Sequence, residues 1–265
     1  MTGANSGIGL ASVLELARRG FDAVGSVRSP AKARQVQQAA RDAGVKVRTV
    51  QLDVSRAADC ARVIARLRPF GLVNNAGYPA SGAVEDVRDD EALAALAVMV
   101  VAPMRLARLA VPHMRERGEG RIVNMSSIYG RTSTPLTGWY QGSKHALEAL
   151  SDALRMEVAG SGVKVVLVEP GGFDTGIWAE TESEIANRAA SRYAAAYGRV
   201  QSGIRLSRPL MGHPSAVARV VANAMASKRP RPRYLVGLDA QAIAMYDRLL
   251  PAEVKDRLAR LGLGL

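Results

Sequence analysis

Three polar residues in the middle of the sequence have the types and spacing needed for proton transfer. Tyr140 and Lys144 lie four residues apart in a stretch with helical periodicity, and Ser127 precedes the tyrosine by thirteen residues. Residues i and i+4 share one face of a helix, so the phenol and the ammonium group project together. A free tyrosine, with a pKa of about 10, is a poor base at neutral pH, and a nearby ammonium group lowers that pKa. We therefore predict that Tyr140 is a general acid or base and that Lys144 tunes it.

Ser127 follows an apolar run that is typical of a buried strand. Its hydroxyl is therefore expected at a strand end, where it can donate a hydrogen bond to a substrate carbonyl oxygen. A tyrosine four residues before a lysine also occurs by chance in many helices, and that pair alone predicts no activity. Two further motifs favour the catalytic interpretation.

The glycines near the start of the chain predict a phosphate-binding loop. Gly3, Gly7 and Gly9 let the backbone turn tightly and approach a pyrophosphate, and the helical pattern that follows points its positive end at that anion. The segment Asn74–Gly77 (NNAG) follows an apolar run, and its amides can bind a neighbouring loop and hold the sheet edge around a cofactor. For either segment taken alone, an ordinary turn is the alternative.

Taken together, these motifs resemble the short-chain dehydrogenase/reductase family, and the resemblance covers essentially the whole chain. It implies that Ser127, Tyr140 and Lys144 are catalytic: Tyr140 exchanges a proton with the substrate oxygen while a hydride moves to or from a nicotinamide. It also implies that Lys144 binds the nicotinamide ribose and that Ser127 orients the carbonyl. The matching segments, in chain order, are TGANSGIG (2–9), Asp53–Val54, NNAG (74–77), NMSS (124–127), YQGSK (140–144) and Pro170–Gly171 followed by Thr175.

The resemblance extends to the cofactor site. It implies that Asp53 contacts the adenine ring and that Thr175 holds the nicotinamide carboxamide. The predicted cofactor-binding residues are Gly3, Asn5, Ser6, Gly7, Ile8, Gly9, Arg28, Asp53, Val54, Asn75, Ala76, Gly77, Tyr140, Lys144, Pro170, Gly171 and Thr175.

Cofactor choice is predicted from the end of the first strand-like run in the chain, the second strand of the family's fold. A carboxylate there would bind the ribose 2′-hydroxyl and repel a 2′-phosphate. The segment Gly25–Ser29 (GSVRS) has no acidic residue, and Arg28 is placed to pair with a 2′-phosphate. NADP(H) is therefore the predicted cofactor. NAD(H) is the alternative, in which Arg28 only stacks on the adenine.

One position departs from the family in a way that bears on catalysis. Met99 occupies the place of an asparagine that holds a water in the family's proton relay. A thioether is a weak acceptor and cannot donate. The kink in this helix is expected to survive, because a water can still bind a backbone carbonyl, and turnover is expected to be slower. A nucleotide-binding pseudoenzyme or sensor with little or no chemistry is the alternative.

A second departure lies at the start of the chain. Only two residues precede Gly3, whereas relatives have a central strand before this motif. Loss of four buried side chains, at about 1.5–3 kcal/mol each, would cost on the order of 6–12 kcal/mol, similar to the whole stability of a domain. We therefore expect a first strand to be missing and the natural start to lie upstream of Met1. A truncated, poorly folding product is the alternative.

The remaining pattern predicts one α/β domain over residues 1–265, a doubly wound parallel sheet of the Rossmann-like type. A charge-rich segment at about 176–214 is expected to form a substrate flap. Within it, Ile177, Trp178, Ile185, Tyr193 and Tyr197 either line an apolar cleft or pack as ordinary surface helices. The expected strands are 22–27, 45–52, 71–75, 121–126, 163–169 and 233–236, and the expected helices are 8–19, 31–43, 57–66, 90–117, 138–159, 214–226 and 246–261.

Composition narrows the class of partner. The net charge of +12 suggests nucleic acid, but the arginines are scattered, and the one dense cluster, Lys228–Arg233, has no interleaved aromatic residues. We therefore expect a small-molecule partner and no nucleic acid. One cysteine and no apolar run of membrane length predict a cytoplasmic protein, and the histidines show no metal-ligand spacing.

The family resemblance further implies a homo-oligomer, a dimer or tetramer, with helices 90–117 and 138–159 as contacts. Three stretches resemble bacterial relatives of the 17β-hydroxysteroid and retinol dehydrogenase branch, which suggests a hydrophobic alcohol or ketone as substrate. They are Ser143–Val158, Glu169–Trp178 and Arg231–Ala240.

Overall fold

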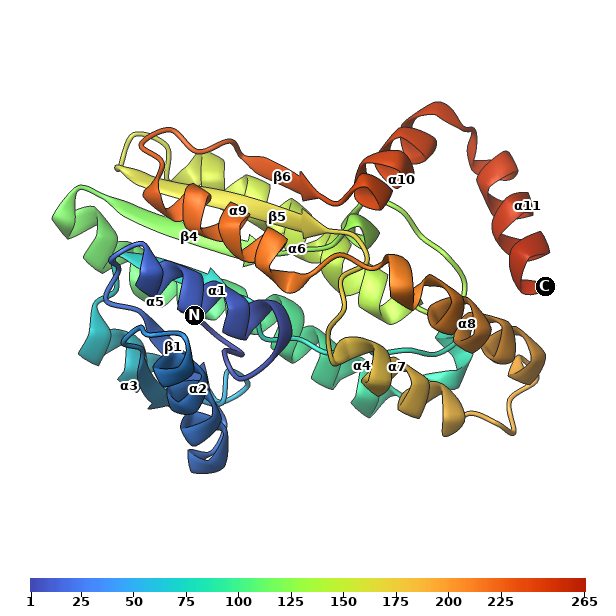
Figure 1. Cartoon of the computed structure of the whole chain (residues 1–265). Helices are drawn as coiled ribbons and strands as arrows, with labels where there is room; N and C mark the ends of the chain where they lie inside the picture. The colour runs from blue at the N-terminus through green and yellow to red at the C-terminus, as the bar shows by residue number, and fades with distance from the viewer.

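Six parallel strands run through the centre of the computed structural model, which describes residues 1–265 (Figure 1). All six predicted strands are confirmed, although several are shorter than expected. Their apolar side chains suit strands that are covered on both faces. In chain order they are β1 (Val24–Val27), β2 (Arg48–Gln51), β3 (Gly71–Asn74), β4 (Gly120–Met125), β5 (Val163–Pro170) and β6 (Arg233–Val236).

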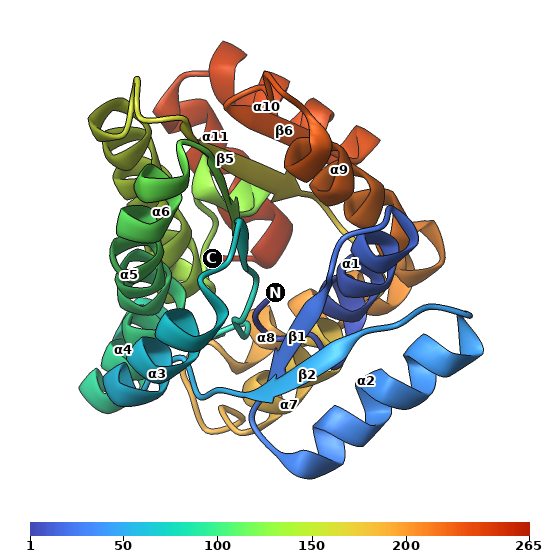
Figure 2. The ribbon, with the colours of Figure 1, turned by 90° about the vertical axis from the view of Figure 1, so that its left-hand side faces the viewer.

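Helices cover both faces of the sheet and enclose two apolar cores (Figure 2). On one face, α1 (Gly7–Arg18) packs beside α9 (Pro214–Ala226). On the other face lie α3 (Ala57–Leu67), α5 (Ala102–Arg117) and α6 (Gly138–Glu157). This arrangement confirms the doubly wound, Rossmann-like class. The other helices are α2 (Pro30–Asp42), α4 (Asp89–Leu96), α7 (Ile177–Ala186), α8 (Ala194–Ser207), α10 (Leu238–Leu249) and α11 (Ala252–Leu263).

The sheet is interrupted between β1 and β3. One part holds β1 and β2, and the other holds β3, β4, β5 and β6 in that order. The first residues of the chain lie in the gap: Ser26 N donates to Met1 O at 2.8 Å, and Thr2 N donates to Val73 O at 2.9 Å. Beneath them is a cavity of about 320 Å³, lined mainly by apolar side chains of β1, β2, β3 and α3. Burial there lowers the pKa of the Met1 ammonium group to about 6.

Two helix predictions need correction. The expected single helix 90–117 is interrupted by a π-helical turn at Ala97–Val101, which separates α4 from α5. Pro103 has no N–H to donate to the Met99 carbonyl, which disfavours a regular α-helix at this point. The expected C-terminal stretch 246–261 is two helices, α10 and α11, that meet at Leu250–Pro251.

Candidate active site

The predicted catalytic pair lies on one face of α6. Lys144 Nζ is 5.5 Å from the centroid of the Tyr140 ring and donates a 2.8 Å hydrogen bond to the Met125 carbonyl at the end of β4. Only 6% of the Lys144 side chain is exposed, while Tyr140 is half-buried. The helix therefore brings the two groups together as their four-residue spacing predicts.

Burial dominates the electrostatics of this pair. It raises the pKa of Tyr140 to about 12, a rise that the nearby Ser127 hydroxyl opposes. It also lowers the pKa of Lys144 to about 8, because the ammonium group loses its hydration, and Glu148 opposes this fall. In this structure, the surroundings therefore raise the pKa of Tyr140, opposite to the lowering that we expected from Lys144.

Ser127 lies two residues beyond β4, where it caps the short 3-10 turn Ile128–Gly130. Its Oγ accepts a 3.2 Å hydrogen bond from Tyr129 N and is almost fully buried. The turn also brings Tyr129 toward the site: burial raises the pKa of this phenol, and its charge affects the pKa of Tyr140. The sequence analysis missed Tyr129, although its position two residues after Ser127 was a usable signal.

The glycine loop has the shape of a phosphate cradle. Gly3 and Gly7 have φ values of +63° and +50°, which other residues rarely adopt. A Cβ on Gly9 would lie 2.0 Å from the Gly3 carbonyl oxygen, so only glycine permits this close approach. Asn5, Ser6 and Ile8 lie in the same turn, and α1 begins at Gly7 with its positive end at the loop.

The NNAG segment holds this loop in place. The Thr2 hydroxyl accepts hydrogen bonds from Asn75 N at 2.9 Å and from Ala76 N at 3.0 Å. Asn75 Nδ2 donates to the carbonyls of Thr2 and Gly3 at 3.1 and 3.2 Å. The amide role expected for this segment is therefore present, and the next residue, Gly77, approaches the side chain of Met99.

The predicted adenine side lies at the carboxyl ends of β1 and β2. Arg28 is exposed directly after β1, and its charge contributes to the low pKa of Asp53. Hydrogen bonds from Ser55 to Asp53 Oδ1 are the larger cause of that lowering. Val54, the residue after Asp53, is buried. An exposed guanidinium directly after the strand suits a ribose that carries a 2′-phosphate.

The predicted nicotinamide side lies after β5. Pro170 ends the strand, and Gly171 N donates to the Val236 carbonyl at 2.9 Å. Asp239 fills the space where a Cβ on Gly171 would lie, so this turn requires glycine. Thr175 lies 3.1 Å from where a Cβ on Gly7 would lie, so the turn after β5 meets the phosphate loop. The predicted nicotinamide side is therefore adjacent to the phosphate loop, and the residues present fit a nicotinamide dinucleotide.

Met99 lies in the π-helical turn and is 1% exposed. Its sulfur would be 3.6 Å from a Cβ on Gly77, so the thioether packs against the backbone of the NNAG segment. The expected irregularity in this helix is present. The apolar side chain of Met99 fills the position at which the family resemblance implies an asparagine amide.

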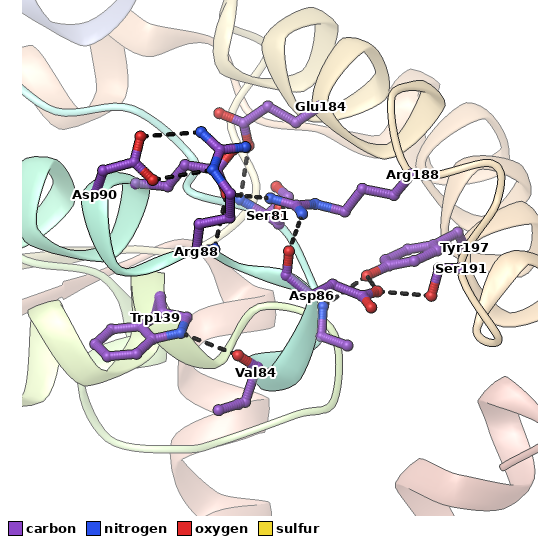
Figure 3. Close-up of polar contacts among 12 residues, drawn as sticks. Ser81, Val84, Asp86, Arg88, Asp90, Trp139, Glu184, Arg188, Ser191 and Tyr197 are labelled. Atoms are coloured by element: carbon purple, nitrogen blue, oxygen red, sulfur yellow. Dashed lines mark hydrogen bonds and ion pairs between the residues drawn. The ribbon is translucent and has the colours of Figure 1, made fainter.

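The flap comprises α7, α8 and the turn between them, and polar contacts tie it to the segment 81–91 (Figure 3). Arg188 Nε donates to the Ser81 carbonyl at 3.1 Å, and its Nη1 donates to the Asp86 carbonyl at 2.5 Å. Ser81 N donates to Glu184 Oε2 at 2.6 Å. Arg188 also pairs with Glu91 at 3.3 Å.

Asp86 is the centre of these contacts. Its Oδ2 accepts hydrogen bonds from Ser191 Oγ and from the Tyr197 hydroxyl, both at 2.7 Å (Figure 3). The same hydroxyl accepts a 2.6 Å hydrogen bond from Ala83 N. Burial acts to raise the pKa of Asp86, but the two donors outweigh it, so the pKa is lowered.

Two of the five flap residues that we considered take the packing role, and the other three are half-buried. Ile185 and Tyr197 are buried in a small core with Ala83 and Leu136, so they pack and do not line a cleft. Trp178 is half-buried at the start of α7, where its Nε1 donates to the Phe173 carbonyl at 2.8 Å. Ile177 and Tyr193 are also half-buried, and the Tyr193 hydroxyl donates to Glu85 at 2.6 Å.

The helical segment Asp89–Arg117 is long and apolar enough to cross a membrane by length and composition alone, which the sequence analysis did not foresee. Half of its most apolar window is buried inside the protein, as in the core helix of an α/β fold. It packs against α3 and the sheet.

Comparison with known proteins agrees with this geometry. The family model described as short chain dehydrogenase matches residues 1–186. The uncharacterized oxidoreductase YbbO of Escherichia coli (strain K12) is 34% identical over 262 residues, which cover 97% of this chain and 92% of that protein. Retinol dehydrogenase 5 of Mus musculus is 30% identical over 279 residues, covering 97% and 85%. The crystal structure of a variant of actinorhodin polyketide ketoreductase with NADPH matches with a TM-score of 0.75 at 29% identity, over 88% of this chain and 92% of that one.

Proposed function

Because the chain belongs to the short-chain dehydrogenase family and is an NAD(P)-binding oxidoreductase, we propose that it interconverts a hydrophobic alcohol and its ketone or aldehyde with NADP(H). One observation carries this proposal. The phenol of Tyr140, the ammonium group of Lys144 and the hydroxyl of Ser127 lie together at the carboxyl end of β4. The phosphate loop lies at the same edge of the sheet, two strands away.

The roles follow from these positions. Tyr140 exchanges the proton with the substrate oxygen, and Ser127 donates a hydrogen bond that orients it. Lys144 supplies the positive charge beside the phenol and binds the ribose hydroxyls. The phosphate loop and the positive end of α1 hold the pyrophosphate, and Thr175 holds the carboxamide. When bound, the nicotinamide accepts or supplies the hydride.

NADP(H) is proposed over NAD(H) because of the charge at the end of β1. Arg28 is exposed there, and no acidic residue follows the strand to repel a 2′-phosphate. A guanidinium binds a phosphate through paired, charge-assisted hydrogen bonds. The structurally similar ketoreductase carries NADPH, which supports this choice.

A hydrophobic substrate is proposed from two observations. The chain is similar to a retinol dehydrogenase over nearly its whole length. Three half-buried side chains in the turn after β4 and at the start of α7, Tyr129, Ile177 and Trp178, offer mainly aromatic and aliphatic surface. Such a lining favours a ligand with a single polar atom on an apolar body.

A nucleotide-binding protein with little or no turnover is the second candidate, and Met99 favours it. The buried thioether stands where the family places a water-binding amide. Binding of NADPH without oxidation or reduction of any substrate would support this candidate.

The test combines cofactor binding with turnover. Fluorescence titration should show NADPH bound at least about tenfold more tightly than NADH, and Arg28→Ala should remove most of that difference, since an arginine–phosphate contact is worth roughly 1.5–3 kcal/mol. A panel of apolar ketones, aldehydes and alcohols should then include substrates that the wild type converts and Tyr140→Phe does not. Equal affinity for both cofactors contradicts the NADP(H) choice, and absence of turnover across the panel contradicts the enzymatic proposal.

A further inference from the structure

The row of polar residues on α6 continues beyond the catalytic pair. Tyr140, Lys144, Glu148 and Asp152 are spaced four residues apart and therefore follow one side of the helix. Glu148 lies one turn beyond Lys144 and is 7% exposed. The reaction proposed above uses the first two of these groups and assigns no role to this buried carboxylate.

The Glu148 carboxylate is only half paired. Its Oε2 lies 3.1 Å from Arg233 Nε, whereas its Oε1 is buried without a hydrogen-bond partner. The buried Ser126 hydroxyl makes no hydrogen bond of good geometry, but it lies close enough to Glu148 to lower the pKa of that carboxyl. A Cβ on Gly130 would lie 2.7 Å from Ser126 Oγ and 3.3 Å from Glu148 Oε1. Both oxygens therefore border the same small space beside Gly130.

Arg233 has carboxylate partners other than Glu148. It also lies 3.2 Å from Glu169 Oε1 and pairs with Asp152 at 2.5 Å. Glu169 in turn has a closer partner in Arg131 at 2.6 Å. The titratable and charged groups that face Lys144 and Glu148 are Tyr140, Asp152 and Arg155 on α6, Tyr129 and Arg131 from the turn after β4, Glu169 on β5 and Arg233 on β6.

We propose that Glu148 is a positioning residue for the proposed reaction: one helical turn beyond Lys144, its buried carboxylate favours the charged form of the buried ammonium group, which donates to the Met125 carbonyl beside the Tyr140 ring. This inference rests on the proposed function for its catalytic meaning. The effect of Glu148 on the charge of Lys144 can be tested without it.

The physical need for such a residue follows from the burial of Lys144. Burial holds the pKa of Lys144 at about 8, close to the range where the amine is neutral, and Glu148 is the group that opposes a further fall. Burial also raises the pKa of Glu148, as expected for a carboxylate in a dry environment. Glu148 therefore favours the charged form of Lys144, while Arg233 favours the charged form of Glu148.

A purely structural role is the rival interpretation, in which Glu148 only ties α6 to β6 through Arg233. Asp152 provides a matched control, because it pairs with the same arginine but lies two turns from Lys144 and is 31% exposed. If the role is structural, Glu148→Gln and Asp152→Asn should have similar consequences. If Glu148 acts through Lys144, only Glu148→Gln should change the titration of the lysine.

The experiment observes Lys144 directly in the full chain without cofactor. The protein has six lysines, so labelling of their ε-carbons with ¹³C gives a simple NMR spectrum, in which Lys144→Met identifies the resonance. Glu148→Gln should lower the titration midpoint of Lys144 by about one pH unit or more. Asp152→Asn should leave the midpoint nearly unchanged. Glu148→Asp, which retains the charge, should give an intermediate value and provides a second variant if Glu148→Gln does not fold.

Activity then connects the pair to the reaction. For carbonyl reduction, the alkaline limb of the kcat profile should move to lower pH in Glu148→Gln by the same amount as the NMR midpoint, with KM nearly unchanged. An unchanged Lys144 midpoint in Glu148→Gln, or an equal change in Asp152→Asn, overturns the proposal. A lowered midpoint in a protein that converts no substrate supports the action of Glu148 on Lys144 and contradicts the proposed function instead.

Discussion

The α6 stripe (Tyr140, Lys144 and Glu148) and the flap are two parts of the proposed site, and they are held in different ways. The stripe comes from one helix with a four-residue repeat and lies against buried strand ends. The flap is held by hydrogen bonds to residues about a hundred positions earlier in the chain, with Asp86 at their centre (Figure 3).

Because of this difference, we expect the stripe to govern the chemical step and the flap to govern access of the substrate to the site. The stripe is set by local helix geometry and by an apolar core, and these contacts change little when a substrate enters. Polar contacts to the flap are individually weak, at about 0.5–1.5 kcal/mol net for a hydrogen bond. They can be released and remade one by one. We therefore expect changes in the stripe to alter kcat and changes in the flap to alter KM.

Tyr140→Phe should have the largest effect. It removes the hydroxyl that we propose exchanges a proton with the substrate, and general acid–base groups contribute roughly 10²–10⁴-fold to rate. We expect kcat to fall by about 10³-fold in a steady-state assay, with NADPH affinity within about twofold of the wild type. Tyr129→Phe removes a neighbouring phenol hydroxyl and should retain most of the activity. Similar losses in the two variants would contradict the distinction between a catalytic and a lining tyrosine.

Asp86→Ala should show the contrasting behaviour. The buried Tyr197 hydroxyl loses its acceptor, and an unsatisfied buried donor costs about 1–3 kcal/mol. KM for substrate should rise by about tenfold with little change in kcat, and limited proteolysis should cut the turn between α7 and α8 faster. Asp90→Ala is the control, because Asp90 pairs only with the exposed Arg88 beside the same loop. A loss of kcat without a change in KM would mean that the flap also positions the catalytic groups.

The same difference explains which parts of the site were predictable. The catalytic pair, the glycine loop and the NNAG segment each lie within a few consecutive residues, and helix or turn geometry converts such spacing directly into proximity. Asn75 and Thr175 come from separate segments, but each follows a strand, and parallel strands end at one edge. The α/β class followed in the same way from alternating apolar runs.

Contacts that depend on packing were not predictable. Tyr197 and Ile185 resemble cleft residues in the sequence but are buried against Ala83, which is about a hundred positions away. In the sequence, Glu148 is an ordinary helical glutamate. In the structure, the turn after β4 and strand β6 enclose it. The charge pattern also gave no sign that burial would outweigh Lys144 in setting the pKa of Tyr140.

The response to pH should separate the two regions as well. Burial lowers the pKa of Lys144 to about 8, so reductive kcat should fall as pH rises through that value and the lysine loses its charge. The pKa of Asp86 is lowered by folding, so its stabilisation of the flap is present above its unfolded pKa of about 3.9 and is lost only as pH falls below it. Rate profiles and proteolysis rates measured from pH 2 to pH 10 should therefore change at opposite ends. A flap that loosens near pH 8 would contradict this.

The smallest expected effect on kcat is that of a substitution at Met99. A rise in kcat would indicate an enzyme that Met99 slows, whereas an inactive protein would gain no turnover. Met99→Asn places an amide in the π-helical turn, where its side chain can bind a water and restore a proton relay. Introducing a polar group at a site that is 1% exposed should cost about 1–3 kcal/mol of stability. We expect kcat to rise by roughly two- to tenfold, because the relay adds a route for the proton to a site whose acid–base group is already present. Met99→Leu, which is apolar and of similar size, should leave kcat unchanged. If Met99→Asn lowers kcat while the protein remains folded by thermal denaturation, the thioether is part of how this active site works and does not weaken it.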